Sequence, residues 1–458
     1  MERLNRCRTP AVSDTRVWLC LPIAFCCVLL ACQAAVHASP PGPAAPELPA
    51  PSAGGFRRAV VVEWGDTIPT APTGFVVERF ADGLDHPRWL YGLPNGDVLV
   101  AQARTETMDG FAPGVIEELT KQGLFGPSPN TIVLLRPDDS GVTRHVLLDN
   151  LQQPFGMALL NGWLYVANTN SLVRYPYRSG QTRIDTPAEL IAMLPAGERT
   201  ADWNNHWTRN VVVSPDGSKL YVSVGSATDV DADGNEPPER AAIWQMDPDG
   251  NNRRLFATGL RNPTGMDFEP VTGALWATVN ERDGLGNDVP PDYVTEVVDG
   301  AFYGWPYAYF GVYPDPTQLK RAPERVATAV KNSRVPDLAL GGHSVPLGLL
   351  FYAGAGFPEP YTDGAFVARR GGVGSSELHG YDVVFLPYVD GRPTGEIQPF
   401  LTGFIADPEQ GMVRGRPVGL ARLTDGSLLV SDDAAHVIWR VRWAGTKEGK
   451  SIALDSSP

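Results

Sequence analysis

A six-fold internal repeat constrains the fold of this 458-residue chain more than any other feature of its sequence. Each copy opens on a Pro or an Arg-Asn pair, continues through an apolar run and a Gly-containing turn, and ends with a second apolar run. The copies start about 50 to 85 residues apart, at Pro87, Pro154, Arg209-Asn210, Pro263, Pro346 and Pro417. A period of this length indicates a repeat architecture.

The apolar runs of each copy have the alternation and β-rich composition of strands. The turns between the first two runs carry pairs such as Asn161-Gly162 and Asp425-Gly426, which favour hairpins because Gly and Asn adopt positive φ. A strand of the type that ends each copy also precedes the first opener, at 75–84, while the chain ends after a third strand near Trp443. We therefore predict an all-β fold: a six-bladed β-propeller over residues 74–445, closed by the N-terminal strand.

The N-terminal residues have a different composition. All five cysteines lie within the first 32 residues, where several arginines precede an apolar run from Val17 to Ala31. The run is short for a membrane span, so we predict a signal peptide over 1–31. Leu29-Leu30-Ala31-Cys32 resembles a bacterial lipobox, in which the cysteine is acylated. The alternative is plain secretion with cleavage near Ala38.

These features predict an exported, periplasmic protein that is lipid-anchored to the membrane. A Pro/Ala-rich tether is predicted over 32–73, and a disordered tail over 446–458. The formal charge of −14 argues against a nucleic-acid partner, because phosphate backbones are bound by clustered Lys and Arg.

A propeller would place the loops that enter the first strands and leave the second strands on one face. These loops are rich in polar side chains. They contain His86, Gln153, His206, Arg261, Asn262, His343, Arg414 and Arg416 before the openers, and Glu281, Arg282, Asp283, Arg369, Arg370, Asp432 and Asp433 after the second strands. Converging Arg, His, Asn and Gln favour an anionic ligand at the axis, since Arg binds carboxylates with two donors. The simpler interpretation is that His86 and His343 order loops and that Arg414 and Arg416 are solvated.

Two motifs in this region resemble a known family. Arg261-Asn262-Pro263-Thr264-Gly265 is followed about 40 residues later by Tyr303-Gly304-Trp305-Pro306. With Asn205-His206 and Gly415-Arg416-Pro417-Val418-Gly419, they make the chain similar to the quinoprotein sugar dehydrogenases, nearest the sorbosone and aldose sugar dehydrogenase branch. The resemblance spans roughly residues 74–443.

The resemblance implies a propeller that holds pyrroloquinoline quinone (PQQ) with Ca²⁺ and oxidises an aldose or a sugar aldehyde, passing electrons to a quinone or cytochrome. It implies His206 as the general base, for which imidazole is suited, and Arg261 as the group that stabilises charge on the quinone oxygen. The implied cofactor-binding residues are Gln153, Asn262, Arg369, Arg370, Arg414 and Arg416. Ca²⁺ would take oxygen ligands, mainly backbone carbonyls, from the loop of Glu281, Arg282 and Asp283.

Two positions depart from the family pattern. Asn205 stands where the glucose-oxidising branch has an acid beside the base, so another group, such as Asp202, could orient His206. A lysine of that branch is replaced by Arg369 or Arg370, which keeps the charge but not the shape.

The acidic loop of Asp229, Asp231 and Asp233 fits the first half of an EF-hand, but its twelfth position is Arg240. It is interpreted either as a second Ca²⁺ site or as an ordinary surface loop. For the whole chain, the alternatives to a dehydrogenase are a propeller lactonase with an axial metal and a non-catalytic ligand-binding propeller. The arginine-rich axis disfavours the lactonase.

Overall fold

The computed structural model describes residues 42–106, 113–121, 123, 125–139, 141–197, 206–354 and 356–445. Contacts divide the chain into two compact units, Met1–Ala38 and Ser39–Pro458, and every described residue belongs to the second. The predicted signal peptide, the lipobox residue Cys32, the predicted tail over 446–458 and the residues Asp202 and Asn205 lie outside the described residues.

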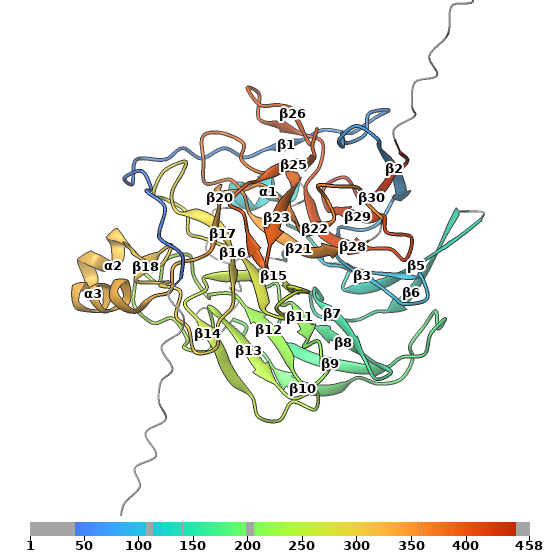
Figure 1. Ribbon diagram of the computed structural model, residues 1–458, viewed down its shortest axis with the longest axis horizontal. Coiled ribbons are helices and arrows are strands. Elements are labelled where there is room, and N and C mark those ends of the chain that lie inside the picture. Colours follow the sequence, from blue (N-terminus) through green and yellow to red (C-terminus); the bar gives the residue numbers. More distant parts are fainter. Residues whose placement is uncertain are drawn as a thin grey trace, which may run out of the picture. The chain divides into compact units, whose positions relative to one another are not determined.

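Antiparallel β-sheet dominates the described residues (Figure 1), so the predicted all-β class is confirmed. The helices in the described ranges are short: α1 (Pro113–Lys121), α2 (Pro316–Arg321) and α3 (Pro323–Asn332). None of them has the length and apolar character needed to cross a bilayer.

Six sheets share one arrangement, in which strands that follow one another along the chain pair antiparallel. The first sheet holds β3 (Pro87–Gly92), β4 (Val98–Gln102), β5 (Thr131–Asp138) and β6 (Gly141–Leu148). The second holds β7 (Met157–Leu160), β8 (Trp163–Ala167), β9 (Ser171–Pro176) and β10 (Glu189–Met193). The third holds β11 (Val211–Val213), β12 (Leu220–Val224), β13 (Ala242–Met246) and β14 (Arg254–Thr258).

The remaining three sheets vary the pattern slightly. The fourth holds β15 (Asn262–Phe268), β16 (Leu275–Asn280), β17 (Pro291–Glu296) and β20 (Leu338–Gly342). The fifth holds β21 (Pro346–Ala353), β22 (Asp363–Arg369) and β23 (Asp382–Val389), with β24 (Arg392–Pro393) and β25 (Gln398–Leu401) both paired to β23. The sixth holds β28 (Pro417–Arg422), β29 (Leu428–Asp432), β30 (Val437–Trp443) and the N-terminal β2 (Phe75–Ala81), in which Phe75 lies opposite Trp443.

The first strands of the six sheets surround a common axis. Each contacts the first strand of the next sheet, and β28 contacts β3. Residues from all six strands (β3, β7, β11, β15, β21 and β28) line one cavity of about 350 Å³.

Four of the five Pro openers, all except Pro87, are followed two residues later by a glycine, and contacts between neighbouring first strands explain this pattern. A Cβ on Gly265 would lie 2.8 Å from the amide nitrogen of Leu349 in the next sheet. A Cβ on Gly348 would lie 2.4 Å from the carbonyl oxygen of Val418. Only a residue without a side chain lets neighbouring first strands approach this closely.

Two small sheets and the helices lie outside the repeat. One sheet joins β1 (Val60–Val61), β27 (Met412–Val413) and β26 (Ile405–Asp407), and the other pairs β18 (Ala308–Tyr309) with β19 (Tyr313–Pro314). Trp64 follows β1 and is buried, with its Nε1 donating to Asp432 Oδ2 at 3.1 Å. The N-terminal segment is thereby attached to the sixth sheet.

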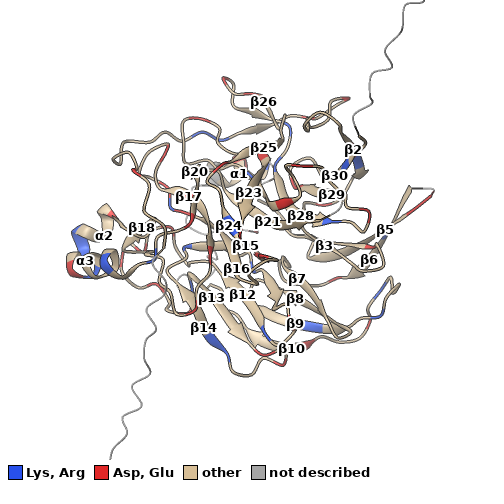
Figure 2. Cartoon of the chain, viewed as in Figure 1, with Lys and Arg blue, Asp and Glu red and all other residues tan. Residues whose placement is uncertain are grey.

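Lys and Arg of the described residues are scattered over the sheets and helices, interspersed with Asp and Glu (Figure 2).

Candidate functional site

A second cavity, of about 440 Å³, lies where the predicted polar loops meet. From the predicted set, its lining contains His206, Arg261, Asn262, Glu281, Asp283, Arg370 and Arg416. It also contains His343, which the sequence placed in the same loops, together with Arg88, Asn280, Asp292 and Tyr381. Asn262 begins β15 and Asn280 ends its neighbour β16. The loops before first strands and after second strands therefore share one end of the sheets.

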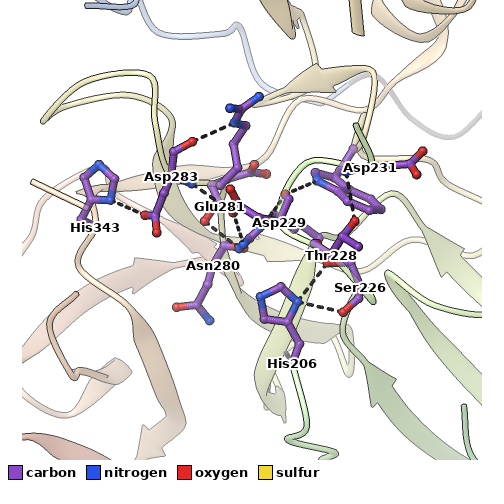
Figure 3. A network of polar contacts seen from close by, with 12 residues as sticks. His206, Ser226, Thr228, Asp229, Asp231, Asn280, Glu281, Asp283 and His343 are labelled. Atoms are coloured by element: carbon purple, nitrogen blue, oxygen red, sulfur yellow. Dashed lines mark hydrogen bonds and ion pairs between the residues drawn. The ribbon is translucent and has the colours of Figure 1, made fainter. Parts of the chain in front are cut away.

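His206 is oriented by Ser226, the second residue after β12 (Figure 3). The imidazole Nδ1 lies 2.9 Å from both the carbonyl oxygen and the Oγ of Ser226. The Ser226 hydroxyl donates its proton to the carbonyl oxygen of Thr228 at 2.6 Å. Both Ser226 oxygens are therefore acceptors toward the ring, so Nδ1 carries the proton and Nε2 has the lone pair.

The electrostatic surroundings keep His206 neutral. Burial and the positive charge of Arg261 lower the pKa of His206 well below its ordinary value, because both disfavour the imidazolium. No described residue hydrogen-bonds to Nε2. The site thus contains a neutral imidazole whose Nε2 is ready to accept a proton.

Arg261 is held in place by two loops. Its Nε and Nη2 donate to Asp229, at 3.0 Å to the carbonyl oxygen and 2.6 Å to Oδ1. Its Nη1 donates to the carbonyl oxygens of Asn280 at 3.0 Å and Glu281 at 2.7 Å. A guanidinium has five N–H donors, so one N–H on Nη2 is left for a ligand.

One wall of the cavity carries buried oxygens without hydrogen-bond partners among the described residues: Asn262 Oδ1, Asn280 Oδ1 and Glu281 Oε2. Burial raises the pKa of Glu281 to about 8. Buried polar atoms are rarely unpaired in native proteins. This wall therefore has the chemistry to accept a hydrogen-bond donor or a cation.

Another part of the lining is an arginine cluster around Asp433. Asp433 is fully buried, and its Oδ2 accepts from Arg88 Nη1 and, at 2.8 Å, from Arg370 Nε. Burial raises the pKa of Asp433, but Arg370, His86 and Arg88 outweigh it and hold the pKa well below its usual range. Burial lowers the pKa of Arg88 to about 10, so its guanidinium stays charged at neutral pH.

Arg416 is the third arginine of the cluster. It is buried, and its guanidinium makes no hydrogen bond or ion pair to any described residue. Burial and the charge of Arg370 lower the pKa of Arg416. Three guanidinium groups thus lie around Asp433, and the Asp432 carboxylate adds a second negative charge near Arg416. The remaining excess of positive charge fits a buried anion.

His343 supports the loop after β16. Its Nδ1 lies 3.0 Å from Asp283 Oδ1 and its Nε2 lies 2.8 Å from the carbonyl oxygen of Gly286. Burial lowers the pKa of His343, but the bonds to Asp283 and Gly286 raise it above its ordinary value overall. Since both partners are acceptors, both ring nitrogens act as donors, and His343 fixes this loop as an imidazolium.

Several predicted residues lie outside the cavity lining. Gln153 donates to the carbonyl oxygen of Arg104 at 3.0 Å, and Arg369 forms a bidentate pair with Asp382 at 2.7 and 2.6 Å. Arg414 lies over the Trp64 ring at 5.9 Å. Arg282 donates to Asp315 Oδ2 at 2.6 Å, so it turns its charge away from the cavity.

The acidic loop is occupied by internal bonds. Asp229 Oδ1 accepts from Arg261, Asp231 Oδ1 accepts from the Glu236 amide at 2.9 Å, and Asp233 Oδ1 accepts from the Asn235 amide at 3.4 Å. Within the described ranges, no three His, Cys, Asp or Glu side chains are grouped to hold a metal. A second Ca²⁺ site at this loop stays a prediction.

Sequence reasoning missed Arg88, Ser226 and Asn280, and gave Asp433 no role. Arg88 directly follows an opener proline, and Asn280 directly precedes a loop that was predicted, so a search one residue further on each side would have found both. Ser226 had no such signal. Its role depends on how β12 places its loop against His206.

These features define a class: an all-β protein of repeated antiparallel sheets whose cavity pairs a neutral histidine with clustered arginines. The chain belongs to the TrAA12-like family, whose model matches residues 69–297. The resemblance to PQQ-dependent sugar dehydrogenases is thus confirmed.

The chain is also similar to individual proteins outside the family model. Aldose sugar dehydrogenase YliI of Escherichia coli is 23% identical over 308 residues, which cover 63% of this chain and 76% of that protein. An uncharacterized protein of Borreliella burgdorferi is 27% identical over 312 residues, covering 65% and 77%. The PQQ domain of pyranose dehydrogenase from Coprinopsis cinerea, solved in its holo form, has a TM-score of 0.63 and 20% identity, covering 82% of this chain and 97% of that one. At this identity the structural likeness shows the fold.

Proposed function

We propose that this protein is a PQQ-dependent dehydrogenase that oxidises an aldose or a sugar aldehyde such as sorbosone. The observation that carries the proposal is the neutral His206, with its free Nε2, in a cavity lined by clustered arginines. The printed names of the relatives, which include sugar dehydrogenases and PQQ-bound structures, support the same class.

The cavity residues fit the cofactor. PQQ carries three carboxylates, and the cluster of Arg88, Arg370 and Arg416 has more positive charge than Asp433 neutralises. The Nε atoms of Arg88 and Arg416 are buried without partners among the described residues. An anion here would supply the missing acceptors.

We place Ca²⁺ at the wall of the cavity that carries unpaired oxygens rather than arginines. The unpaired oxygens of Asn262, Asn280 and Glu281 are hard ligands of the type Ca²⁺ prefers. The Arg282 guanidinium is committed to Asp315, so this residue could contribute only its backbone carbonyl.

The chemistry follows from the positions of the protein groups. Bound PQQ supplies the hydride acceptor. His206 Nε2 takes the proton of the substrate hydroxyl, or of a hydrated aldehyde, while the carbon gives up its hydride. Arg261 directs its one remaining N–H toward developing negative charge. The substrate would lose two electrons and become a lactone or an acid, and a quinone or cytochrome would serve as the final electron acceptor.

We also propose the blade number of the fold and the cellular location of the protein. The six sheets, the contact of β28 with β3 and the pairing of β2 with β30 support a closed six-bladed propeller. We also propose export to the periplasm with a lipid anchor at Cys32, which the N-terminal sequence pattern supports.

Reconstitution tests the function directly. Apoprotein given PQQ and Ca²⁺ should reduce an artificial dye when aldoses or sorbosone are added. Lactone hydrolysis without PQQ would establish the lactonase alternative instead. PQQ binding without turnover of any sugar in a broad panel would establish a binding propeller.

Arg416→Gln is expected to weaken PQQ binding about 10- to 100-fold, because it removes a charge-assisted partner of the cofactor. The apoprotein should lose no stability, since the Arg416 guanidinium has no bond to a described residue and its burial is costly. Absorbance titration with PQQ and urea unfolding measure the two effects. Arg442→Gln is the control, because the Arg442 side chain on β30 is 42% exposed and lies outside the cavity lining. Unchanged PQQ affinity in Arg416→Gln would contradict the placement of the cofactor.

Gly225→Ala is expected to lower turnover about 10- to 100-fold while the protein remains folded. An added Cβ would lie 2.3 Å from Asn262 Oδ1 and 2.6 Å from His206 Cβ, so both side chains must shift. The dye assay measures turnover, and circular dichroism checks the fold. Gly114→Ala is the control, because its Cβ meets nothing within 4 Å. Wild-type turnover in Gly225→Ala would show that the exact position of His206 is unimportant.

A further inference from the structure

Residues 48–64, which we call the N-terminal strap, lie against the loops around the cavity. The strap contributes amide donors to three separate loops. The bonds run from Ser52 to the Leu285 carbonyl oxygen at 2.8 Å, from Arg57 to that of Val373 at 3.1 Å and from Val60 to that of Gly411 at 2.9 Å. Glycine permits this approach at Gly55, where a Cβ would lie 2.3 Å from Ser376 Cβ. The strap is therefore a fixed part of the cavity wall.

Two strap side chains line the cavity, and the residue between them does not. Phe56 and Arg58 are part of the lining with His206 and Arg261. Arg57 points away, and its Nη1 donates to the carbonyl oxygen of Pro408 at 2.6 Å. This alternation is that of extended backbone, in which residues two apart face the same side.

Arg58 differs from the other arginines of the lining. Arg88 and Arg370 pair with Asp433, and Arg261 pairs with Asp229. In the described residues, the Arg58 guanidinium forms no hydrogen bond or ion pair, and its Nε is buried without a partner. Its guanidinium carbon lies 5.1 Å from the centre of the Phe56 ring.

Exposure places this pair at the mouth of the cavity. Phe56 is 60% exposed and Arg58 is half-buried, whereas Arg88, Arg261 and Arg416 are buried. A molecule that enters the cavity therefore passes Phe56 and Arg58 before it reaches the buried arginines. The deeper arginines suit the cofactor carboxylates, which leaves Arg58 for the substrate.

We propose that Arg58 binds the carboxylate of an acidic sugar, a hexuronate, with Phe56 against the apolar face of the sugar ring. The proposal rests on the dehydrogenase function above and names its substrate class. A guanidinium recognises a carboxylate through two parallel N–H donors, and an aromatic side chain provides an apolar surface beside it.

The test compares Arg58→Gln with Arg57→Gln in the PQQ-loaded protein. Glucuronate and glucose form one substrate pair, and galacturonate and galactose the other, since each pair differs only at C6. Wild type should show the lower KM for the acids. Arg58→Gln should raise the KM for the acids about 10- to 100-fold and change that for the neutral sugars less than about threefold. Arg57→Gln should leave both unchanged.

Three further results decide the origin of any effect. The affinity for PQQ, measured by absorbance titration, should be equal in wild type and Arg58→Gln. A weaker affinity would assign Arg58 to the cofactor and overturn the proposal, as would equal KM values for acid and neutral sugars in wild type. If no sugar is oxidised, the proposed dehydrogenase function is wrong. Calorimetry of glucuronate with the PQQ-loaded protein then tests the role of Arg58 by itself. Equal glucuronate affinity of wild type and Arg58→Gln would overturn that role.

Discussion

His206→Ala is expected to lower kcat by about 100- to 10,000-fold, the usual contribution of a positioned general base. The loss follows because the Nε2 lone pair is the proton acceptor that Ser226 holds in place, and no other neutral imidazole lines the cavity in the described residues. PQQ affinity should change little, since the arginine cluster remains. Stopped-flow reduction of the bound cofactor measures the step directly.

His145→Ala is the matched control, because His145 lies on β6, outside the cavity lining. The pH profile gives an independent check. The base form of His206 exists above its pKa, and burial with Arg261 lowers that pKa. The rate should therefore be constant down through about pH 6.5, the ordinary histidine value, and fall only below it. A variant that retains more than about a tenth of the wild-type kcat would remove His206 from the role of base.

Asp433→Asn is expected to cost the apoprotein about 3–5 kcal/mol of unfolding free energy, as when one partner of a buried ion pair is removed. Asparagine keeps the shape but not the charge, so Arg88 and Arg370 lose the carboxylate that neutralises them. Urea unfolding measures the change. Added PQQ should restore part of the stability, because its carboxylates replace the lost charge.

Asp382→Asn is the control. Asp382 also pairs with an arginine through two bonds, but this pair is partly exposed, so its loss should cost about 1 kcal/mol or less. The low folded-state pKa of Asp433 means that its contribution is complete above the unfolded value of about 3.9 and is lost as the pH falls below it. The difference between wild type and Asp433→Asn should therefore shrink in acid. Equal losses of unfolding free energy in Asp433→Asn and Asp382→Asn would show that Asp433 is not needed to neutralise Arg88 and Arg370.

Most of the correct predictions about fold and site follow from sequence patterns among neighbouring residues. Strand alternation and Gly-containing turns are properties of neighbouring residues, so the repeat was sufficient for the all-β class. The same register placed His206, Arg261, Asn262 and Arg416 beside the openers, and the structure brings them to one cavity. Arg369 and Arg414 carry the same chemistry in sequence, but Asp382 and the Trp64 ring hold them elsewhere.

The sequence by itself determined the repeated strands, the loops that would hold polar side chains and the family motifs, because each depends on residues close together in the chain. Only the tertiary structure decided which of these residues meet. Ser226 becomes the partner of His206, Asp433 joins Arg88 from 345 positions away, and Phe56 and Arg58 reach the cavity through a strap that composition alone suggested was a tether. Hydrogen bonds, burial and charge pairing between distant segments are set when the sheets pack, and no local pattern encodes them.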